Sequence, residues 1–432
     1  MIKFNWETEF KQTEIGKVPR EWGVRKLECA IESLETGNRP KGGSLQYDPK
    51  GILSIGGENI SWEGDLILDG CLRFAESFYN SLKRGRIKER DILLVKDGAT
   101  IGKLAFIKNV PEGRAMVNEH VFLIRTNEKE YHPRFLFYFL FSDAGQLQIE
   151  SLISGSAQGG INRSILDTIK IPKFDFTEQS RIATVLSWFD DLIENKKRQN
   201  EILEKVAMAI FKSWFVDFEP FKDEEFVYSE ELGKEIPKGW EVDFATKFID
   251  FNPLIRLMKG KVYPFVEMKQ VFTNSAVCEF DYKEFTGSGV KYRGDDTLMA
   301  RITPSLEHGK TAYVWFISEE ENGFGTTEFF VLHPKKSWLK EFTYLLAKNE
   351  DFKDTAINSM TGTSGRQRAD VNALKNFFIP IPPQPILEKF HSLVEPLFQK
   401  IILNQKQIMV LRKIRDALLP KLVFGRLRVE EI

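Results

Sequence analysis

Two long stretches of the chain carry apolar residues at helical spacing. In residues 177–218, two rows of positions recur every seven residues; they are Ile182, Phe189, Lys196, Leu203 and Ile210, and Leu186, Ile193, Asn200, Ala207 and Trp214. Residues 385–425 repeat the pattern 208 positions later, with the rows Phe390, Leu397, Asn404, Leu411 and Leu418, and Val394, Ile401, Ile408, Arg415 and Leu422. Such a repeat predicts a long helix that buries one stripe.

Each helix of about 38 residues would be roughly 57 Å long, which exceeds the width of a small domain. The stripes also contain Lys196, Asn200, Asn404 and Arg415, which are hard to bury inside a globular core. We therefore expect the two helices to bury their stripes against each other. The alternative is that they are two ordinary core helices that happen to be long.

The segments before the helices repeat as well. A proline followed three residues later by tryptophan occurs at Pro19/Trp22 and at Pro237/Trp240, 218 residues apart. A proline in an extended segment followed by a buried tryptophan is typical of the entry to a domain, and we call this segment a strap. Patterns for strands, a helix, a small-residue loop and a closing strand then follow in the same order in both halves. In the first half they span 51–60, 90–107, 132–142, 154–164 and 169–172. In the second half they span 263–271, 295–314, 336–348, 361–371 and 377–383. A tandem duplication with an approximate two-fold axis is thus predicted.

This order predicts an α/β (α+β) fold, with two mixed α/β domains separated by two long antiparallel helices. The expected segments are a strap and first domain (1–176), a first helix (177–220), a second strap and domain (221–384) and a second helix with its tail (385–432). The repeat offset drifts from 218 to about 208, so the first domain should carry extra residues in its early part.

Composition narrows the function classes. The 432 residues are 42% hydrophobic and 28% charged, with a formal net charge of −1, so a nucleic-acid ligand would have to meet local basic patches. There is no signal-peptide pattern and no apolar run of about 20 residues, which favours a cytoplasmic protein. Cys29, Cys71 and Cys278 are isolated and the five histidines are scattered, so no metal site is predicted.

Several segments resemble the specificity subunits of type I restriction-modification systems. They are GKVPREW at 16–22, GKEIPKGW at 233–240, TGNRPK at 36–41, the strand pair around Gly102-Lys103 and LRKIRDALLPKLVFGRLRV at 411–429. The resemblance covers nearly the whole chain, in the same order and twice over.

This resemblance implies two target-recognition domains, each of which reads one half of a split, asymmetric sequence in double-stranded DNA. The helices would set the spacing and dock two modification (methyltransferase) subunits, and a restriction (motor and nuclease) subunit could join. The chain itself would then be non-catalytic and hold no cofactor, with S-adenosylmethionine, ATP and Mg²⁺ belonging to the partner subunits.

Direct readout needs Arg or Lys for guanine and Asn or Gln for adenine. In the first domain the candidate loop residues are Asn38, Arg39, Lys41, Arg84, Arg86, Lys96, Lys103, Gln158, Asn162 and Arg163. In the second they are Lys291, Arg293, Arg301, Lys310, Thr363, Ser364, Arg366, Gln367 and Arg368. The loop 361–368 is the strongest single candidate, although each residue could equally be a solvated cation or contact only phosphate.

A second predicted set serves the helix pair or partner docking. Its members are Leu186, Phe189, Ile193, Lys196, Asn200, Leu203, Ile210, Trp214, Val394, Leu397, Ile401, Asn404, Ile408, Leu411, Arg415 and Leu418. The polar members Lys196, Asn200, Asn404 and Arg415 are candidates for fixing the register, because an apolar stripe alone tolerates slippage.

Other activities fit the sequence less well. A DNA methyltransferase would need an Asn/Asp-Pro-Pro-aromatic motif, but Asn252-Pro253 is followed by Leu254, and there is no P-loop for an ATP-driven motor. Asp250 with Glu267-Met268-Lys269 has the residue types of a metal-dependent nuclease, without an equivalent at 55–58. A helical scaffold that does not bind DNA remains an alternative, but it would not need basic loops in both domains.

Overall fold

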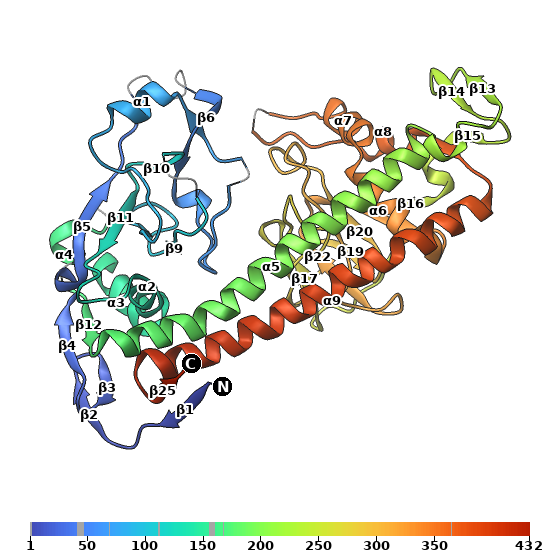
Figure 1. Ribbon diagram of the computed structural model, residues 1–432. Coiled ribbons are helices and arrows are strands. Elements are labelled where there is room, and N and C mark those ends of the chain that lie inside the picture. Colours follow the sequence, from blue (N-terminus) through green and yellow to red (C-terminus); the bar gives the residue numbers. More distant parts are fainter. Residues whose placement is uncertain are drawn as a thin grey trace. The chain divides into compact units, whose positions relative to one another are not determined.

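The computed structural model describes residues 2–40, 47–68, 70–110, 113–154, 160–166, 168–363 and 365–432. The chain forms two compact units (Figure 1). The first unit combines Met1–Asp191 with Leu411–Ile432, and the second unit comprises Leu192–Val410. Each unit therefore contains one mixed α/β domain together with parts of two long helices.

A four-stranded antiparallel sheet lies at the centre of the first unit. Its order is β5-β11-β8-β9, with bounds Ile31–Thr36, Val121–Thr126, Ile92–Val95 and Leu104–Phe106. Successive side chains of a strand point to opposite faces, and both faces of this sheet are buried. Toward the helices point Ile92, Leu94, Phe122 and Ile124, whereas the opposite face carries Leu93, Val95, Val121 and Leu123.

Helices cover one face of this sheet and a smaller sheet covers the other. The helices are α2 (Pro133–Phe141) and α3 (Asp143–Ser154). The smaller sheet has the order β10-β6-β7, with bounds Ala115–Val117, Tyr47–Ile55 and Arg73–Phe74, and α1 (Glu76–Ser81) packs beside it. Helix α2 is apolar nearly all round and six of its nine side chains are aromatic or leucine residues buried in the core, as expected for a helix enclosed on all sides.

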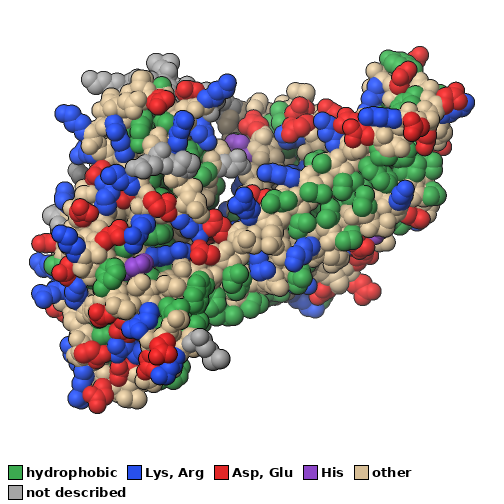
Figure 2. All heavy atoms as spheres, in the orientation of Figure 1, with side chains coloured by type: hydrophobic (Ala, Val, Ile, Leu, Met, Phe, Trp, Pro, Cys, Tyr) green, Lys and Arg blue, Asp and Glu red, His purple; other side chains and the backbone are tan. Residues whose placement is uncertain are grey.

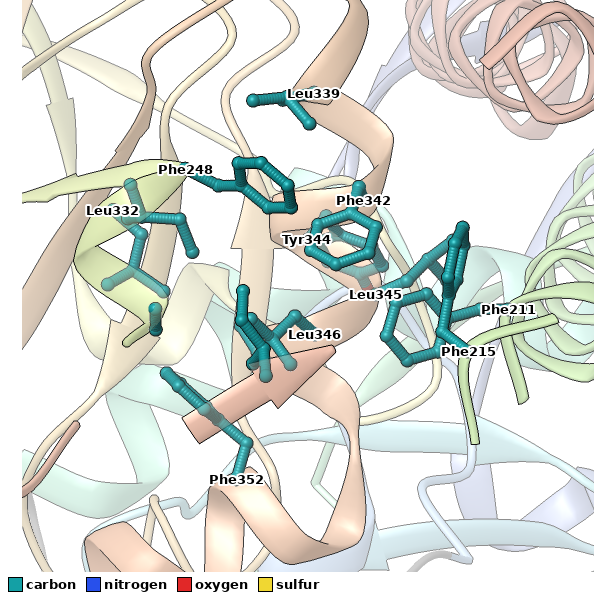
Figure 3. Packing of buried hydrophobic residues seen from close by; sticks show 14 of the residues in the cluster. Phe211, Phe215, Phe248, Leu332, Leu339, Phe342, Tyr344, Leu345, Leu346 and Phe352 are labelled. Atoms are coloured by element: carbon teal, nitrogen blue, oxygen red, sulfur yellow. The ribbon is translucent and has the colours of Figure 1, made fainter. Parts of the chain in front are cut away.

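The second unit repeats this plan. Its central sheet has the order β16-β23-β20-β21, with bounds Ile249–Phe251, Phe329–Pro334, Thr297–Ala300 and Thr311–Tyr313. Helices α6 (Lys340–Lys348) and α7 (Glu350–Asn358) cover one face. The second sheet has the order β18-β17-β22-β19, with bounds Asp281–Glu284, Val262–Val266, Asn322–Gly325 and Val290–Arg293. Figure 3 shows Phe342 and Leu345 of α6 beside Phe211 and Phe215 in the main core of this unit.

Each strap is a short β-hairpin followed by a buried tryptophan. In the first unit, β2 (Phe10–Thr13) pairs with β3 (Gly16–Pro19), and β4 (Gly23–Lys26) pairs with β12 (Lys170–Lys173). The second unit has β13 (Phe226–Ser229) with β14 (Lys234–Pro237), and β15 (Glu241–Phe244) with β24 (Phe378–Ile381). Trp22 and Trp240 are buried at the ends of these hairpins, which confirms the prediction for both straps.

The two long helices are α5 (Phe176–Phe215) and α9 (Gln384–Val423), each of 40 residues. They run antiparallel, because Asp190 contacts Arg415 in the first unit and Asn200 contacts Asn404 in the second. Helix α5 ends three residues before the predicted Phe218, whose backbone is left-handed with φ 53°. After α9 the chain forms β25 (Leu427–Glu431), which pairs with β1 (Lys3–Trp6), so the last residues complete the first unit.

The predicted seam of the helices is only partly correct. The row Leu186, Ile193, Asn200 and Ala207 is buried, but Phe189, Lys196, Leu203 and Ile210 of the other α5 row are half-buried. Phe211 and Phe215 are buried in addition, because the second domain packs against that side of α5. The heptad rows thus mark the helix–helix contact, and the domain cores widen the buried face.

Short helices complete the fold. They are η1 (Leu27–Ala30), η3 (Gly57–Asn59), α4 (Arg163–Leu166), η4 (Glu219–Phe221), η5 (Ala245–Lys247), η6 (Met268–Gln270), η7 (Ser337–Leu339) and α8 (Val371–Lys375). Within the part of the chain that the structure describes, no helix is both long enough and apolar enough to cross a membrane.

Candidate nucleic-acid interface

Three strands of the first unit meet at one end of the central sheet. Strand β11 begins at Val121, which pairs with Val95 at the end of β8, and Phe122 pairs with Thr36 at the end of β5. The residues that follow or precede these strands are therefore neighbours in space. We call this end of the central sheet, where the strands run into loops, the loop end; the second unit has a corresponding loop end.

Charged side chains are paired with one another at the first loop end. Asp97 accepts from Lys96 Nζ at 2.7 Å and lies 2.5 Å from His120 Nδ1. Glu119 lies 3.3 Å from His120 Nε2 and 2.8 Å from Arg39 Nε. Partial burial opposes ionisation of Asp97, but the hydrogen bonds from Lys96 and His120 lower its pKa. Cluster 1, defined as Arg39, Lys96, Asp97, Glu119 and His120, is thus a connected network of charges.

Two further loops dock against the first loop end. The Ile161 amide donates to Lys96 O at 2.7 Å, which brings the exposed side chains of Asn162 and Arg163 to this edge. On the other side Gly37 N donates to Asn118 O, and Gly85 packs so closely on Gly37 that a Cβ on Gly85 would lie 2.7 Å from Gly37 Cα. The exposed Asn38 and Arg84 flank these two glycines.

The second loop end is built from the same backbone contacts. Ala300 at the end of β20 pairs with Phe329 at the start of β23, and Arg301 N donates to Glu328 O at 2.9 Å. The chain beyond Thr361 returns to this edge, where Ala369 N donates to Arg301 O at 2.8 Å. Thr303 and Gln367 exchange two further bonds, Thr303 N to Gln367 O and Gln367 N to Thr303 Oγ1, each 3.1 Å long.

The side chains at the second loop end are mostly cationic. Arg368 makes a two-pronged contact with Glu328, from Nε to Oε2 at 2.8 Å and from Nη2 to Oε1 at 2.6 Å. Arg301 lies 5.0 Å above the ring of Phe330 and donates to Ala369 O at 3.3 Å. Arg366 is exposed and Gln367 is half-buried. Cluster 2 is defined as Arg301, Glu328, Arg366, Gln367 and Arg368.

Equivalent positions of the two loop ends differ in chemistry. The bond from Lys96 N to His120 O corresponds to the one from Arg301 N to Glu328 O, and the bridge of Asp97 with Gly160 corresponds to that of Ile302 with Arg368. Lys96 and Arg301 are 205 residues apart (301−96), and His120 and Glu328 are 208 residues apart (328−120), in keeping with the repeat. One backbone frame therefore presents two different sets of side chains.

Comparison with known proteins agrees with this duplicated plan. The family profile described as the type I restriction modification DNA specificity domain matches residues 19–205 and 245–413. The type I restriction enzyme MjaIX specificity subunit of Methanocaldococcus jannaschii is 36% identical over 443 residues, covering 100% of this chain and 99% of that protein. The chain belongs to the type I restriction-modification specificity subunits.

Other members match parts or all of this specificity subunit. The MjaVIII specificity subunit of the same organism is 28% identical over 204 residues, which is 46% of this chain and 47% of that protein. A crystal structure of the type I S subunit from M. genitalium aligns over 93% of this chain and 96% of its own, with 18% identity and a TM-score of 0.49.

Some predicted DNA contacts of the specificity subunit lie away from the loop ends or point elsewhere. Lys310 immediately precedes β21, but its ammonium donates to Met268 O at 2.9 Å, and burial lowers its pKa. Lys103 immediately precedes β9 and lies 5.8 Å above the Trp62 ring, where burial lowers its pKa as well. Arg86 stacks on Tyr79 and donates to Asn80 O, while Lys291 and Arg293 belong to the other sheet of the second unit.

The other predicted residues lie in the long helices, in the second unit or outside the described part of the chain. Lys41, Gln158 and Ser364 lie outside the described residues. Of the helix residues, Trp214, Leu397, Leu411 and Leu418 are half-buried, and Val394, Ile401, Ile408 and Arg415 are buried. The nuclease candidates are engaged with lysines: Asp250 lies 3.6 Å from Lys335, and Glu267 contacts Lys269 and Lys283. Among the described residues, no group of three His, Cys, Asp or Glu side chains is arranged to hold a metal ion.

Both clusters also contain residues that the sequence did not single out, which are the acidic residues and one histidine. Asp97, Glu119, His120 and Glu328 were not among the candidates, since only base-pairing cations and amides were considered. A signal was present for two of them, because His120 immediately precedes β11 and Glu328 immediately precedes the corresponding strand β23, at the repeat offset of 208 residues. These side chains orient the cations that were predicted.

Proposed function

We propose that each unit of this specificity subunit reads one half of a bipartite DNA target through its loop end. The supporting observation is the duplicated frame with different side chains at equivalent positions, such as Lys96 and Arg301. A duplicated frame gives both halves the same approach to a duplex. Different side chains give each half its own base preference, because bases are discriminated by the donors and acceptors that meet their edges.

The electrostatics agree with a limited contact area. With a net charge of −1 the whole surface does not attract DNA strongly, so attraction has to come from cations gathered at particular edges. Arg39, Arg84 and Arg163 are exposed near the first loop end, and Arg366 and Arg368 near the second. Some of these contact phosphate and position the duplex, while others contact bases.

The long helices offer a surface for the modification subunits. In the second unit, exposed apolar side chains follow both helices; they are Leu192, Ile202 and Val206 of α5, and Leu393, Leu403 and Val410 of α9, with exposures between 43% and 55%. Figure 2 shows hydrophobic side chains gathered over these helices. Apolar area of this kind on a helix is typical of a protein interface. Two modification subunits dock on the helices, and restriction subunits join them; these partners supply catalysis, S-adenosylmethionine, ATP and Mg²⁺.

A domain exchange tests the proposed function. Residues 25–170 are replaced by the equivalent segment of a related specificity subunit, and the chain is reconstituted with its modification subunits. Methylated or bound sequences are then determined from a randomised duplex library. We expect one half of the target to change and the other half to persist. A change in both halves would contradict the modular assignment.

The same assay separates the scaffold alternative. A scaffold would retain the modification subunits on a column and yet shift random and selected duplexes equally in a gel. If the selected duplex competes for binding more strongly than random duplex does, the result supports sequence-specific DNA recognition instead. If the complex bound selected and random duplexes equally while the modification subunits stayed bound, DNA recognition by this chain would be refuted.

A further inference from the structure

Arg368 is held in a fixed orientation on a fixed piece of backbone. Its own N–H and C=O bond to Thr361, at 2.9 and 3.1 Å, and it forms a bridge with Ile302. Glu328 is anchored as well, through Glu328 N to Thr326 Oγ1 at 3.0 Å and through its carbonyl to Arg301 N. Both partners of the ion pair are therefore rooted in strands or bridges, which lowers the entropy cost of presenting the guanidinium to a ligand.

The contact with Glu328 uses the donors on one edge of the Arg368 guanidinium and leaves the donors on another edge available. A guanidinium carries five N–H donors, of which Glu328 takes the one on Nε and one on Nη2. Among the described residues, Glu328 is the acceptor that this side chain meets, and the Arg368 side chain is 48% exposed. Two parallel N–H groups, one on Nη1 and one on Nη2, thus form a free outward edge.

That outward edge matches guanine. The O6 and N7 acceptors of guanine lie side by side in the major groove and accept two parallel N–H donors. A lysine or a freely rotating arginine could serve a phosphate equally well, but an arginine clamped by a carboxylate has lost the freedom to follow the phosphate backbone. The second loop end also places Arg301 and Arg366 nearby as additional cations for the phosphates.

The pair belongs to one unit alone. Glycine occupies the position equivalent to Arg368 (Gly160), and His120 occupies the position of Glu328. A feature that merely stabilised the shared frame would be expected in both units. A feature that distinguishes two half-sites would be expected in one.

We propose that Arg368 reads a guanine in the half-site recognised by the second unit, and that Glu328 is the positioning residue that presents its outward edge. This inference rests on the proposed function, since it assigns one base contact within it. The proposal therefore requires that the second half-site contains at least one G·C pair whose guanine faces this loop end.

The test compares variants of the full chain, reconstituted with its modification subunits, on a randomised duplex library. Arg368→Lys keeps the charge and removes the parallel donors, so we expect preference for guanine at one position of one half-site to fall by roughly 5- to 150-fold. All other positions should keep their preference. Glu328→Gln should weaken the same position without affecting the others. Lys335→Gln is the matched control, because Lys335 pairs with Asp250 beyond the other end of β23.

The outcomes distinguish this inference from the function on which it rests. No sequence preference in the wild-type complex would overturn the proposed function itself. A bipartite preference that Arg368→Lys leaves intact would overturn the guanine contact alone. If Glu328→Gln raised affinity for all duplexes alike and left every base preference unchanged, Arg368 would be a phosphate contact released from its partner, and the positioning role would be wrong. The exchange Arg368→Glu with Glu328→Arg should keep the ion pair and the melting temperature but lose the guanine preference.

Discussion

Asn404 donates a hydrogen bond from Nδ2 to Oδ1 of Asn200 at 2.9 Å, between helices α9 and α5 in the interior of the second unit. Both side chains are buried, and Asn200 Nδ2 continues the network to Ile401 O at 3.4 Å. Paired amides on an apolar seam penalise slipped registers, because a slip leaves each amide buried against apolar groups. This contact fits the predicted role of the two asparagines in fixing the register.

Replacing one member of this pair should cost more than replacing both. In Asn404→Leu, the buried Asn200 loses its donor, so we expect a loss of about 1–3 kcal/mol in the stability of the second unit. The double variant Asn200→Leu, Asn404→Leu removes both polar groups and should recover most of that loss. Melting temperatures of the wild type, the single variants Asn200→Leu and Asn404→Leu, and the double variant give the coupling. Gln399→Leu at an exposed α9 position is the control, and an equal loss there would contradict the assignment.

Gly425 closes helix α9 where an added side chain has no room. Its φ of +63° is left-handed, and a Cβ would lie 2.6 Å from Pro19 Cγ and 2.9 Å from Trp22 Cη2. Gly425→Ala should therefore destabilise the first unit by about 2–4 kcal/mol, from backbone strain and overpacking together. Gly70→Ala in the same unit, with φ +67° and no described atom within 4 Å of the added Cβ, measures the strain alone. Calorimetric melting of both variants should show the larger drop for Gly425.

The repeat made much of this fold predictable. The seven-residue rows, the Pro-x-x-Trp straps and the strand patterns report burial along the local chain, and burial is what creates periodicity. Trp22 and Ile193 were therefore placed in the interior from sequence alone, and both long helices were predicted, although the expected first helix (177–220) extends five residues beyond the end of α5. The extra buried side of α5 was missed, since Phe211 and Phe215 pack against Phe342 of α6, which lies more than a hundred residues later in the sequence.

Side-chain partners at the loop ends were not predictable in this way. The Arg368–Glu328 pair depends on the register of β20 against β23 and on the return of the loop 361–368, both of which are long-range facts. The direction of Lys310 was equally hidden, because a Gly-Lys turn does not reveal that the ammonium reaches Met268 O. The sequence therefore identified loops that the structure brings to the loop ends, together with cations that lie or point elsewhere.

His132 gives the first unit an acid-sensitive position. Burial, together with the nearby positive charges of Arg90 and Arg134, lowers its pKa from 6.5 to about 4. Between these two values the unfolded chain binds a proton that the folded chain does not, so stability falls as the pH drops from about 6.5 toward 4. After allowance for partial exposure, we expect about 1 kcal/mol to be lost between pH 7 and pH 5.

Substitution of His132 should remove this part of the pH dependence. His132→Gln cannot gain a charge, so its melting temperature should fall less between pH 7 and pH 5 than that of the wild type. The same substitution at the exposed His308 of the second unit serves as the control. Parallel pH slopes for the wild type and His132→Gln would show that the imidazole is not held neutral.

In the proposed function, the length of the helix pair sets the spacing between the two half-sites. Seven residues are inserted after Lys196 in α5 and seven after Ile408 in α9, close to the facing Asn200 and Asn404. Seven residues preserve the heptad seam and lengthen each helix by about 10 Å, which corresponds to at most about three base pairs of duplex. We expect both half-sequences to persist in a library selection while the gap between them grows. The insertion in α5 alone is the control, since it breaks the pairing and should lower the melting temperature. An unchanged gap in a stable double-insertion chain would mean that something other than these helices sets the spacing.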